Sequence, residues 1–193
     1  MTAAALMGGY GLGSIPFGVI LMRMSGAGDL RQIGSGNIGA TNVLRTGRKG
    51  LAAGTLLLDA AKGAAAVCIA RSVDPSLAIV AGAGAFFGHL YPVWLGFKGG
   101  KGVAVLLGIT LALLWPIGLI FAAVWLGAMA ITRISSVGGM AAAVSAPVAA
   151  YLLLDWRTAA ILGGLATILI WKHRDNIERL RAGTEPRIGA RKE

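Results

Sequence analysis

Four long windows of this sequence contain no Asp, Glu, Lys or Arg: residues 1–22, 75–97, 102–132 and 134–154. The hydrocarbon core of a bilayer is about 30 Å thick, and about 20 apolar helical residues cross it. Each window is long enough for such a helix. A water-soluble helical protein of 193 residues would have to hide all four windows from solvent. The pattern therefore predicts an all-α integral membrane protein.

We expect seven transmembrane helices, some of them short or partial. One uncharged window, 102–132, would measure about 46 Å as a single helix, well over the hydrocarbon thickness. Trp115-Pro116 lies near its middle, and proline breaks or kinks a helix, so two pieces are favoured. Whether both pieces cross fully stays open, and five or six spans are the alternative. The expected spans are about 3–22, 50–70, 77–95, 103–114, 117–132, 137–154 and 158–171.

The cations predict an orientation. With seven spans and the N-terminus outside, fifteen of the eighteen Lys and Arg fall on four cytosolic segments, 23–49, 96–102, 133–136 and 172–193. Cytoplasmic loops of membrane proteins carry such an excess. A single span over 102–132 would instead put the basic tail outside. We therefore expect one membrane-embedded domain over residues 1–193, with a cytosolic C-terminus.

Two features of the spans predict how they pack. Asp59 and Lys62 lie three residues apart on one face of the second span. Ionisable groups at membrane depth face the bundle interior, so we expect an internal ion pair. His89 is expected to be a structural hydrogen-bonding group. Small residues allow close helix contact, and the first span offers Gly8, Gly9, Gly11, Gly13 and Gly18.

Two loops combine glycines with hydroxyl, amide and cationic side chains. The first is Gly34-Ser-Gly-Asn-Ile-Gly-Ala-Thr-Asn42 with Arg45 just beyond it, and the second is Gly96-Phe-Lys-Gly-Gly-Lys-Gly102. Glycine lets bare backbone N–H groups approach a ligand, and successive N–H groups form a nest for an anion. Neither loop contains an acid. We therefore favour anion binding over the alternative that these are only turns with orienting charges.

Several other chemistries are excluded. Gly34–Gly39 fits G-x-G-x-x-G, but no βαβ pattern surrounds it. Gly100-Lys101 resembles a Walker A motif, yet the motif's first glycine would be Leu95 and its hydroxyl residue would be Gly102. The net charge of +10 comes without any nucleic-acid module, so no nucleic-acid partner is expected. No carboxylate or cysteine set predicts a metal ion or cofactor.

The ordered motifs resemble those of the bacterial acyl-phosphate:glycerol-3-phosphate acyltransferases, the PlsY family. Besides the two loops, the resemblance includes His173-Arg-Asp-Asn-Ile177, Gly13-Ser-Ile-Pro-Phe-Gly18 and Gly88-His-Leu-Tyr-Pro-Val93, and it covers nearly the whole chain. It implies a multi-pass enzyme of the bacterial cytoplasmic (inner) membrane, with seven helices and a cytosolic site. It implies transfer of a fatty acyl group from acyl phosphate to the 1-hydroxyl of glycerol 3-phosphate, giving lysophosphatidic acid and phosphate without a cofactor. This is the first acylation step of phospholipid synthesis.

The residues then receive hypothetical roles within the cytosolic loops 23–49, 96–102 and 172–178. Ser35, Lys101 and His173 are the candidate catalytic residues. Either His173 or the donor's own phosphate would accept the hydroxyl proton. The donor would be held by Ser35, Asn37, Thr41 and Asn42, and the acceptor by Arg45, Lys101, His173 and Asn176, with Lys98 shared or peripheral. Backbone N–H groups of Gly99, Gly100 and Gly102 complete the expected substrate site.

Two rival classes explain the composition equally well. A transporter or channel for a phosphorylated solute would also need basic loops, and an assembly scaffold would need no ligand. The expected partners are the two substrates and the bilayer, with a functional link to the enzyme that supplies acyl phosphate. Acyl-chain preference, oligomeric state and the phosphate that each cation contacts are left open.

Overall fold

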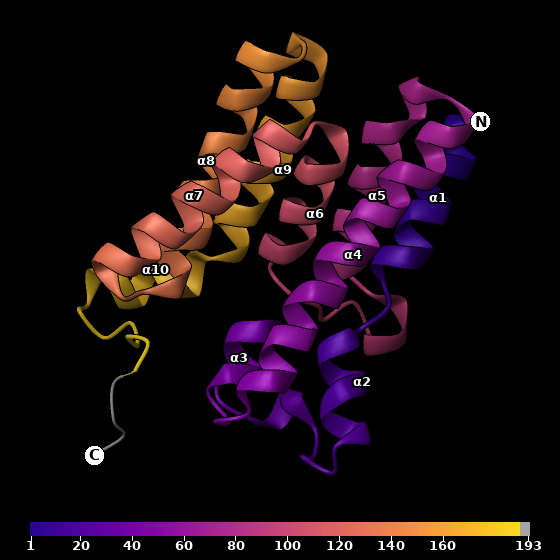
Figure 1. Ribbon diagram of the computed structural model, residues 1–193. Coiled ribbons are helices and arrows are strands. Elements are labelled where there is room, and N and C mark those ends of the chain that lie inside the picture. The colour runs from indigo at the N-terminus through magenta and orange to yellow at the C-terminus, as the bar shows by residue number, and fades with distance from the viewer. Residues whose placement is uncertain (190–193) are drawn as a thin grey trace. The chain divides into compact units, whose positions relative to one another are not determined.

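The computed structural model describes residues 1–189, and every regular element in that part of the chain is a helix (Figure 1). The chain divides into two compact units, one over Met1–Leu113 and one that begins at Leu114. The expectation of one domain over residues 1–193 stays a prediction. The first unit contains α1 (Thr2–Gly13), α2 (Phe17–Met24), α3 (Ala40–Leu44), α4 (Lys49–Val73), α5 (Ala78–Leu90), α6 (Val103–Leu113) and the 3-10 turns η1 (Leu30–Gln32), η2 (Pro75–Leu77) and η3 (Val93–Leu95). The second unit contains α7 (Trp115–Thr132), α8 (Ser135–Leu153), α9 (Trp156–Lys172) and α10 (Arg174–Arg181).

The predicted all-helical membrane class is confirmed. Within residues 1–189, five helical segments are long and apolar enough to cross a membrane. Helices α6, with 11 residues, and α9, with 17, are shorter, so the count of seven crossings and the orientation stay predictions. The five segments are Thr2–Met24, Lys49–Val73, Pro75–Leu95, Trp115–Thr132 and Ser135–Leu153.

Large apolar side chains cover the outside of these helices. Leu57 on α4 is 68% exposed, Ile131 on α7 is 86% exposed and Leu152 on α8 is 72% exposed. In water such a surface would favour association, whereas in a bilayer the acyl chains of lipids cover it. The exposed apolar faces therefore agree with a membrane environment.

The long uncharged window is divided as its proline predicts. Helix α6 ends at Leu113, Leu114 is extended with φ −157° and ψ 114°, and α7 begins at Trp115. Pro116 lies in the first turn of α7, where its missing N–H removes no helical hydrogen bond. The prediction of two helical pieces over residues 102–132 is confirmed.

The first span is also broken, between α1 and α2. Residues 14–16 leave the helical conformation, so carbonyl groups in the break have no helical N–H partners of their own. The indole Nε1 of Trp94 donates to the Ser14 carbonyl at 2.8 Å, and Lys62 Nζ donates to the Ile15 carbonyl at 2.7 Å. Side chains from η3 and α4 therefore supply hydrogen bonds to the carbonyl groups at the break and connect it to the rest of the first unit.

Helices α1 and α5 approach each other closely through glycine. A Cβ on Gly9 or Gly13 would collide with a backbone carbonyl of α5, and one on Gly84 or Gly88 would collide with a carbonyl of α1. Such backbone contact gives dispersion and weak Cα–H hydrogen bonds where lipid removes the hydrophobic driving force. The packing role predicted for Gly9 and Gly13 is confirmed.

The other glycines of the first span differ. A Cβ on Gly18 would collide with the carbonyl of Ile38, so its predicted close contact is confirmed, although with a loop and not a helix. Nothing lies within 4 Å of a Cβ built on Gly8 or Gly11, so the prediction for these two was wrong. Their positions on α1 face away from α5, and only the opposite face of that helix is in contact.

In the second unit, α8 packs against both α7 and α9. Its contact faces are built from small buried residues, including Gly138, Ala142, Ala146 and Ala150. Asp155 begins α9 by accepting hydrogen bonds from two backbone N–H groups of the first turn. The polar segment after α9 forms α10, as expected from the sequence.

A pair of substitutions in α1 tests the glycine contact. Gly13→Ala should destabilise the protein by about 2 kcal/mol because the new methyl group collides with the α5 backbone. Gly11→Ala should be neutral or stabilise by about 0.5–1 kcal/mol, since alanine favours a helix and the space is open. Thermal unfolding in detergent, monitored by tryptophan fluorescence, compares the stabilities of the two variants. Equal unfolding temperatures would contradict the assignment of the contact face.

Candidate functional site

The first glycine loop is organised by the side chain of Asn42, which is 2% exposed. Its Nδ2 donates to the carbonyl groups of Leu30 at 3.2 Å and Ile33 at 2.8 Å. Its Oδ1 accepts from the Ser35 backbone N–H at 3.1 Å and from Ser35 Oγ at 3.4 Å. An amide side chain can make about four such bonds. Asn42 therefore uses its hydrogen-bonding capacity to fix the shape of the loop. Its expected contact with the acyl phosphate stays a prediction.

Local turns hold the rest of this loop. Asn37 Oδ1 accepts from the Gly39 N–H at 2.9 Å, which is an Asx turn. Gly34 and Gly36 have φ of +56° and +68°, a left-handed conformation that favours glycine. These two glycines therefore allow the turns of the loop, and their expected contact with an anion stays a prediction. Ser35, between them, is exposed at the surface.

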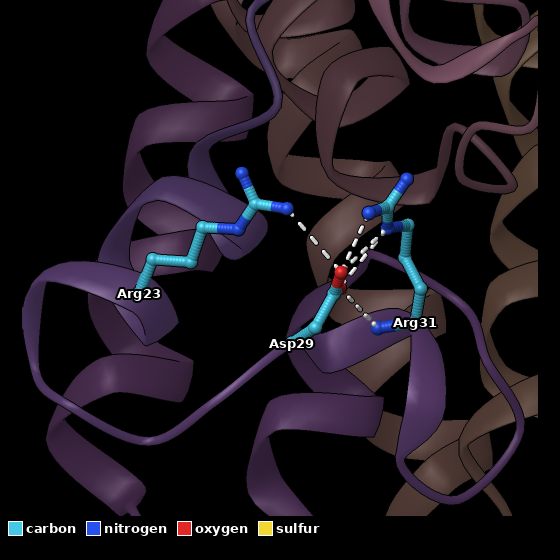
Figure 2. A network of polar contacts seen from close by, with 3 residues as sticks. All are labelled: Arg23, Asp29 and Arg31. Atoms are coloured by element: carbon cyan, nitrogen blue, oxygen red, sulfur yellow. Dashed lines mark hydrogen bonds and ion pairs between the residues drawn. The ribbon is translucent and has the colours of Figure 1, made fainter.

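Three charged residues order the entrance to this loop, and Figure 2 shows them. Asp29 caps η1 and accepts from the Arg31 backbone N–H at 3.0 Å and from the Arg31 guanidinium at 2.5 Å. Arg23 Nη2 lies 3.3 Å from Asp29 Oδ2. These donors, with Arg31 first, hold the pKa of Asp29 well below its usual range. Two arginines at this entrance therefore share one carboxylate as their ion-pair partner.

Arg45 differs from those two arginines. It is exposed, it follows α3, and within residues 1–189 no carboxylate lies within ion-pair distance of it. Its Cδ lies near Gly34, 3.6 Å from an added Cβ there, so its stem runs along the glycine loop. Thr41 is also exposed, one turn before Arg45. The charge of Arg45 therefore lies beside the Ser35 turn without a bound acid.

The second glycine loop is fixed to the end of α5. The N–H groups of Gly99 and Gly100 donate to the carbonyl groups of Leu90 at 3.1 Å and His89 at 3.0 Å. A Cβ on Gly100 would collide with the His89 ring, and one on Gly102, at φ +91°, would collide with the Phe86 ring. Only glycine fits these contacts. Lys98 is exposed and Lys101 is half-buried, so this rigid turn carries two cations.

Beneath this loop lies a buried charged group formed by Asp59, Lys62 and His89, whose side chains are 3–4% exposed. Lys62 Nζ is 2.7 Å from Asp59 Oδ1, which confirms the predicted ion pair. His89 Nδ1 is 3.6 Å from the same oxygen, while the ring touches Gly100. The structural role expected of His89 agrees with this position. The group therefore connects α4 to the second loop through α5.

Both glycine loops lie at one end of the first unit. Leu95 of η3, directly before the second loop, packs against the apolar cluster that contains Ile38 and Val43 of the first loop. Helices α2 and α3 belong to the same end of the unit (Figure 1). The structure therefore brings the residues of 34–45 and 98–102 to one region. Their individual contacts with substrate stay predictions.

In the second unit, His173 and Asn176 are buried at the start of α10, 4% and 5% exposed. His173 Nδ1 lies 2.8 Å from the Leu169 carbonyl. A carbonyl oxygen only accepts, so Nδ1 carries the proton and Nε2 carries the lone pair in the neutral ring. This tautomer suits a group that accepts a proton or a hydroxyl hydrogen bond. The two side chains lie one helical turn apart, as the sequence predicted.

A carboxylate that sequence reasoning missed lies beside them. Glu185 is 8% exposed and accepts from Ser136 Oγ at 2.7 Å, Asn176 Nδ2 at 2.6 Å and Arg179 Nε at 2.7 Å. The tail that carries it folds back, since the Ile188 N–H donates to the Arg133 carbonyl at 2.7 Å. The signal was present in the sequence, because Glu185 is the one acid among the cations of residues 179–192.

Comparison with known proteins decides the family. The sequence model of the family described as glycerol-3-phosphate acyltransferase matches residues 3–183. A glycerol-3-phosphate acyltransferase of Mesorhizobium japonicum is 58% identical, and the match covers 97% of this chain and 96% of that protein. The chain belongs to the glycerol-3-phosphate acyltransferase family. Another family member, from Rhodopseudomonas palustris, is 56% identical over 98% of this chain and 97% of its own.

Solved structures of the same family share this fold. A crystal structure of the integral membrane glycerol 3-phosphate acyltransferase PlsY in its glycerol 3-phosphate form gives a TM-score of 0.92 and 35% identity. That match covers 97% of this chain and 96% of the other. The lysophosphatidic acid form gives 0.90 and 33%, with 97% and 95% covered. The resemblance to PlsY, inferred from the loop motifs, is confirmed.

Substitutions in the buried charged group test its part in this family member's fold. Lys62→Met removes the ammonium partner of the buried Asp59 carboxylate, although His89 stays 3.6 Å from it, and removes the donor to Ile15, at a cost of about 3 kcal/mol. Asp59→Leu combined with Lys62→Met removes both charges and should recover much of that loss. Thermal unfolding in detergent measures both. A double variant as unstable as the single one would contradict the pairing.

Glu185 gives a prediction for pH. Burial raises the pKa of its carboxyl, but the donors Asn176, Ser136 and Arg179 outweigh burial and hold the pKa below the ordinary 4.5. The carboxylate therefore stabilises the fold fully above about pH 4.5, and this stabilisation is lost as the pH falls through the lowered pKa. The unfolding temperatures of wild type and Glu185→Gln should differ at pH 6 and converge on acidification. A difference independent of pH would contradict the prediction.

Proposed function

We propose that the protein transfers a fatty acyl group from acyl phosphate to the 1-hydroxyl of glycerol 3-phosphate, giving lysophosphatidic acid and phosphate. The observation that carries this proposal is the likeness to PlsY at a TM-score of 0.92 over 97% of the chain. The two solved forms of PlsY are described by glycerol 3-phosphate and by lysophosphatidic acid, an acceptor and its acylated product. The choice of acyl phosphate as donor is what the resemblance of the loop motifs to the PlsY family implies.

The chemistry of the first unit supports this reaction. Both proposed substrates carry phosphate, and the two glycine loops at one end of the unit carry hydroxyls and cations. Ser35, Asn37, Thr41 and Asn42 are assigned to the donor, with Asn42 acting through the shape of the loop. Arg45 and Lys101 are assigned to the acceptor's phosphate, and Lys98 is shared or peripheral.

Prearranged loops lower the barrier in two ways. Holding two anionic substrates in fixed positions removes much of the entropic cost of their encounter. Donors and cations that are already oriented stabilise charge as it develops on the acyl oxygen and the leaving phosphate. The hydrogen bonds of Asn42, Gly99 and Gly100 supply that order before any substrate binds. Ser35 and Lys101 are therefore the proposed catalytic groups of the first unit.

In the second unit, His173 and Asn176 are assigned to the hydroxyl end of the acceptor. The acceptor's oxygen attacks the acyl carbon, the bond from that carbon to the phosphate oxygen breaks, and the hydroxyl proton must leave. Either the departing phosphate takes this proton, or Nε2 of His173 does. The pH–rate profile distinguishes these two routes for the proton. His173→Ala would change the lower limb of that profile only if His173 is the base.

We place the protein in the cytoplasmic membrane of a bacterium, with the glycine loops facing the cytosol. The support is the concentration of Lys and Arg on segments 23–49, 96–102 and 172–193. A membrane site also suits an acyl donor, whose chain can stay among lipid tails while its phosphate reaches the loops. An enzyme that makes acyl phosphate is the implied supplier of the donor.

Turnover in detergent tests the proposal. Purified protein should release phosphate from palmitoyl phosphate only when glycerol 3-phosphate is added, with lysophosphatidic acid formed in equal amount. Ser35→Ala and Lys101→Met should each lower kcat/KM by about a hundredfold, as loss of a donor to developing charge does elsewhere. Arg23→Gln is the matched control, because that cation pairs with Asp29 and is not assigned to either substrate.

The rival functions give different outcomes. A transporter would show no turnover in detergent and would need a sealed membrane to reveal its activity. A scaffold would keep its behaviour when Ser35 or Lys101 is replaced. Turnover without glycerol 3-phosphate would show a simple acyl phosphatase and would overturn the proposed acceptor.

A further inference from the structure

An apolar groove lies at the end of α7, within the second unit. It has a volume of about 380 Å³ and is lined by Leu126, Met129 and Ala130 of α7, by Arg133 and by Ile188 of the tail. The tail reaches this place because the Ile188 N–H donates to the Arg133 carbonyl at 2.7 Å, and Figure 1 shows the segment after α10 beside the end of α7. These five residues form the α7 groove, which combines four apolar side chains with one cation.

Arg133 ends α7 in a conformation that is unusual for arginine. Its φ is +60° and its ψ is +20°, and its N–H donates to the Met129 carbonyl at 2.8 Å. Glycine is the usual residue at such a helix end, because a Cβ disfavours the left-handed conformation. The chain carries a long cationic side chain here instead. A backbone held in this region at a cost points to a task for its side chain.

The protein holds the guanidinium group of Arg133 only weakly. Its Nη2 lies 3.4 Å from the Ile188 carbonyl, which is long for a hydrogen bond. Within residues 1–189 no carboxylate lies within ion-pair distance of this group, whereas Arg179 of the same unit has one. The side chain is exposed. A guanidinium group has five N–H donors, so Arg133 can still bind an anion.

The place of the groove along α7 indicates what kind of anion it meets. Helix α7 is long and apolar enough to cross a bilayer, and Arg133 directly follows its last residue, Thr132. Ile131, at the same end, is 86% exposed, as expected of a side chain among lipid tails. In the proposed orientation this end faces the cytosol, where the leaflet contains anionic lipids. A lipid offers both a phosphate for the cation and an acyl chain for the apolar lining.

We propose that the α7 groove binds one anionic phospholipid of the bilayer, with the Arg133 guanidinium on its phosphate and one acyl chain against Met129 and Ile188. Arginine suits a phosphate because its planar donors can bind two oxygens at once. Since Ile188 forms one wall of the groove, the bound lipid also holds the tail against α7. This inference goes beyond the proposed acyl transfer and does not depend on it.

The alternative is that Arg133 only orients the chain in the membrane and that any neighbouring lipid fills the groove. The two cases differ in lipid preference. An orienting cation gives no preference among bound lipids. A site built around one guanidinium group prefers a lipid with a net negative charge over one whose headgroup also carries a positive charge.

Native mass spectrometry of the full-length protein in detergent measures this preference. The protein is titrated with phosphatidylglycerol or with phosphatidylcholine of the same acyl chains. The first phosphatidylglycerol should bind about tenfold more tightly, the effect of one hydrogen bond to a charged group. Arg133→Asn should abolish the preference, and asparagine tolerates the left-handed backbone. Arg157→Gln removes an exposed cation at the opposite end of α8 and is the matched control that should keep the preference.

Ile188→Ala tests the apolar half of the groove. It shortens one wall but keeps the backbone hydrogen bond to Arg133, so the affinity for phosphatidylglycerol should fall about fivefold with less apolar surface buried. Thermal unfolding gives an independent measurement, since a ligand that binds the folded state stabilises it. Phosphatidylglycerol should raise the unfolding temperature of wild type and Arg157→Gln more than that of Arg133→Asn.

Equal affinities of the wild-type protein for the two lipids would overturn the inference. So would a preference that persists in Arg133→Asn, or one that Arg157→Gln also loses, which would show a general attraction to a basic protein. A dimer that dissociates in Arg133→Asn would assign the groove to a second copy of the chain and would overturn it as well. These measurements use no turnover, so a failure of the proposed function would not affect them.

Discussion

The first unit depends on the charge of Lys62 inside an apolar bundle. Its ammonium group lies 2.7 Å from Asp59, donates to the carbonyl of Ile15 at 2.7 Å and lies 5.7 Å from the centre of the Phe17 ring. A buried charge costs several kcal/mol unless it is paired and hydrogen-bonded. The Lys62 ammonium group keeps these partners only when the break between α1 and α2 lies beside α4. His89 extends this constraint to the second glycine loop.

The glycines perform two different tasks. Within α1 and α5 they let two backbones touch, which compensates for the absent hydrophobic drive between helices in lipid. In the loops they allow left-handed turns and direct contact with a ring, as at Gly34 and Gly100. The loop backbones are thus held by the protein's own hydrogen bonds. A site of this kind is ordered before ligand arrives, and a proposed reaction between two anions needs such order.

Local charge balance, more than total charge, decides which cations remain for a ligand. The chain has a net charge of +10, yet Arg23 and Arg31 both pair with Asp29, and Glu185 accepts from Arg179. Asp29, Asp59, Asp175 and Glu185 each pair with a cation, and neither glycine loop contains an acid. Glu185 shows that an acid in a basic segment is informative, because burial of a carboxylate requires donors gathered from several elements. Because its donors come from α8 and α10, Glu185 connects the tail to these two helices.

The sequence by itself determined the helical membrane class, the break at Trp115-Pro116, the pair of Asp59 with Lys62 and the family resemblance. These follow from local patterns: uncharged length, proline chemistry, helical spacing and ordered motifs. Only the tertiary structure decided that Gly9 and Gly13 contact α5 while Gly8 and Gly11 do not, since periodicity does not say which face meets a neighbour. It also decided that Asn42 turns inward and that Glu185 binds Asn176. A hydrogen-bond partner distant in sequence depends on how the chain folds back, and no local pattern encodes that path.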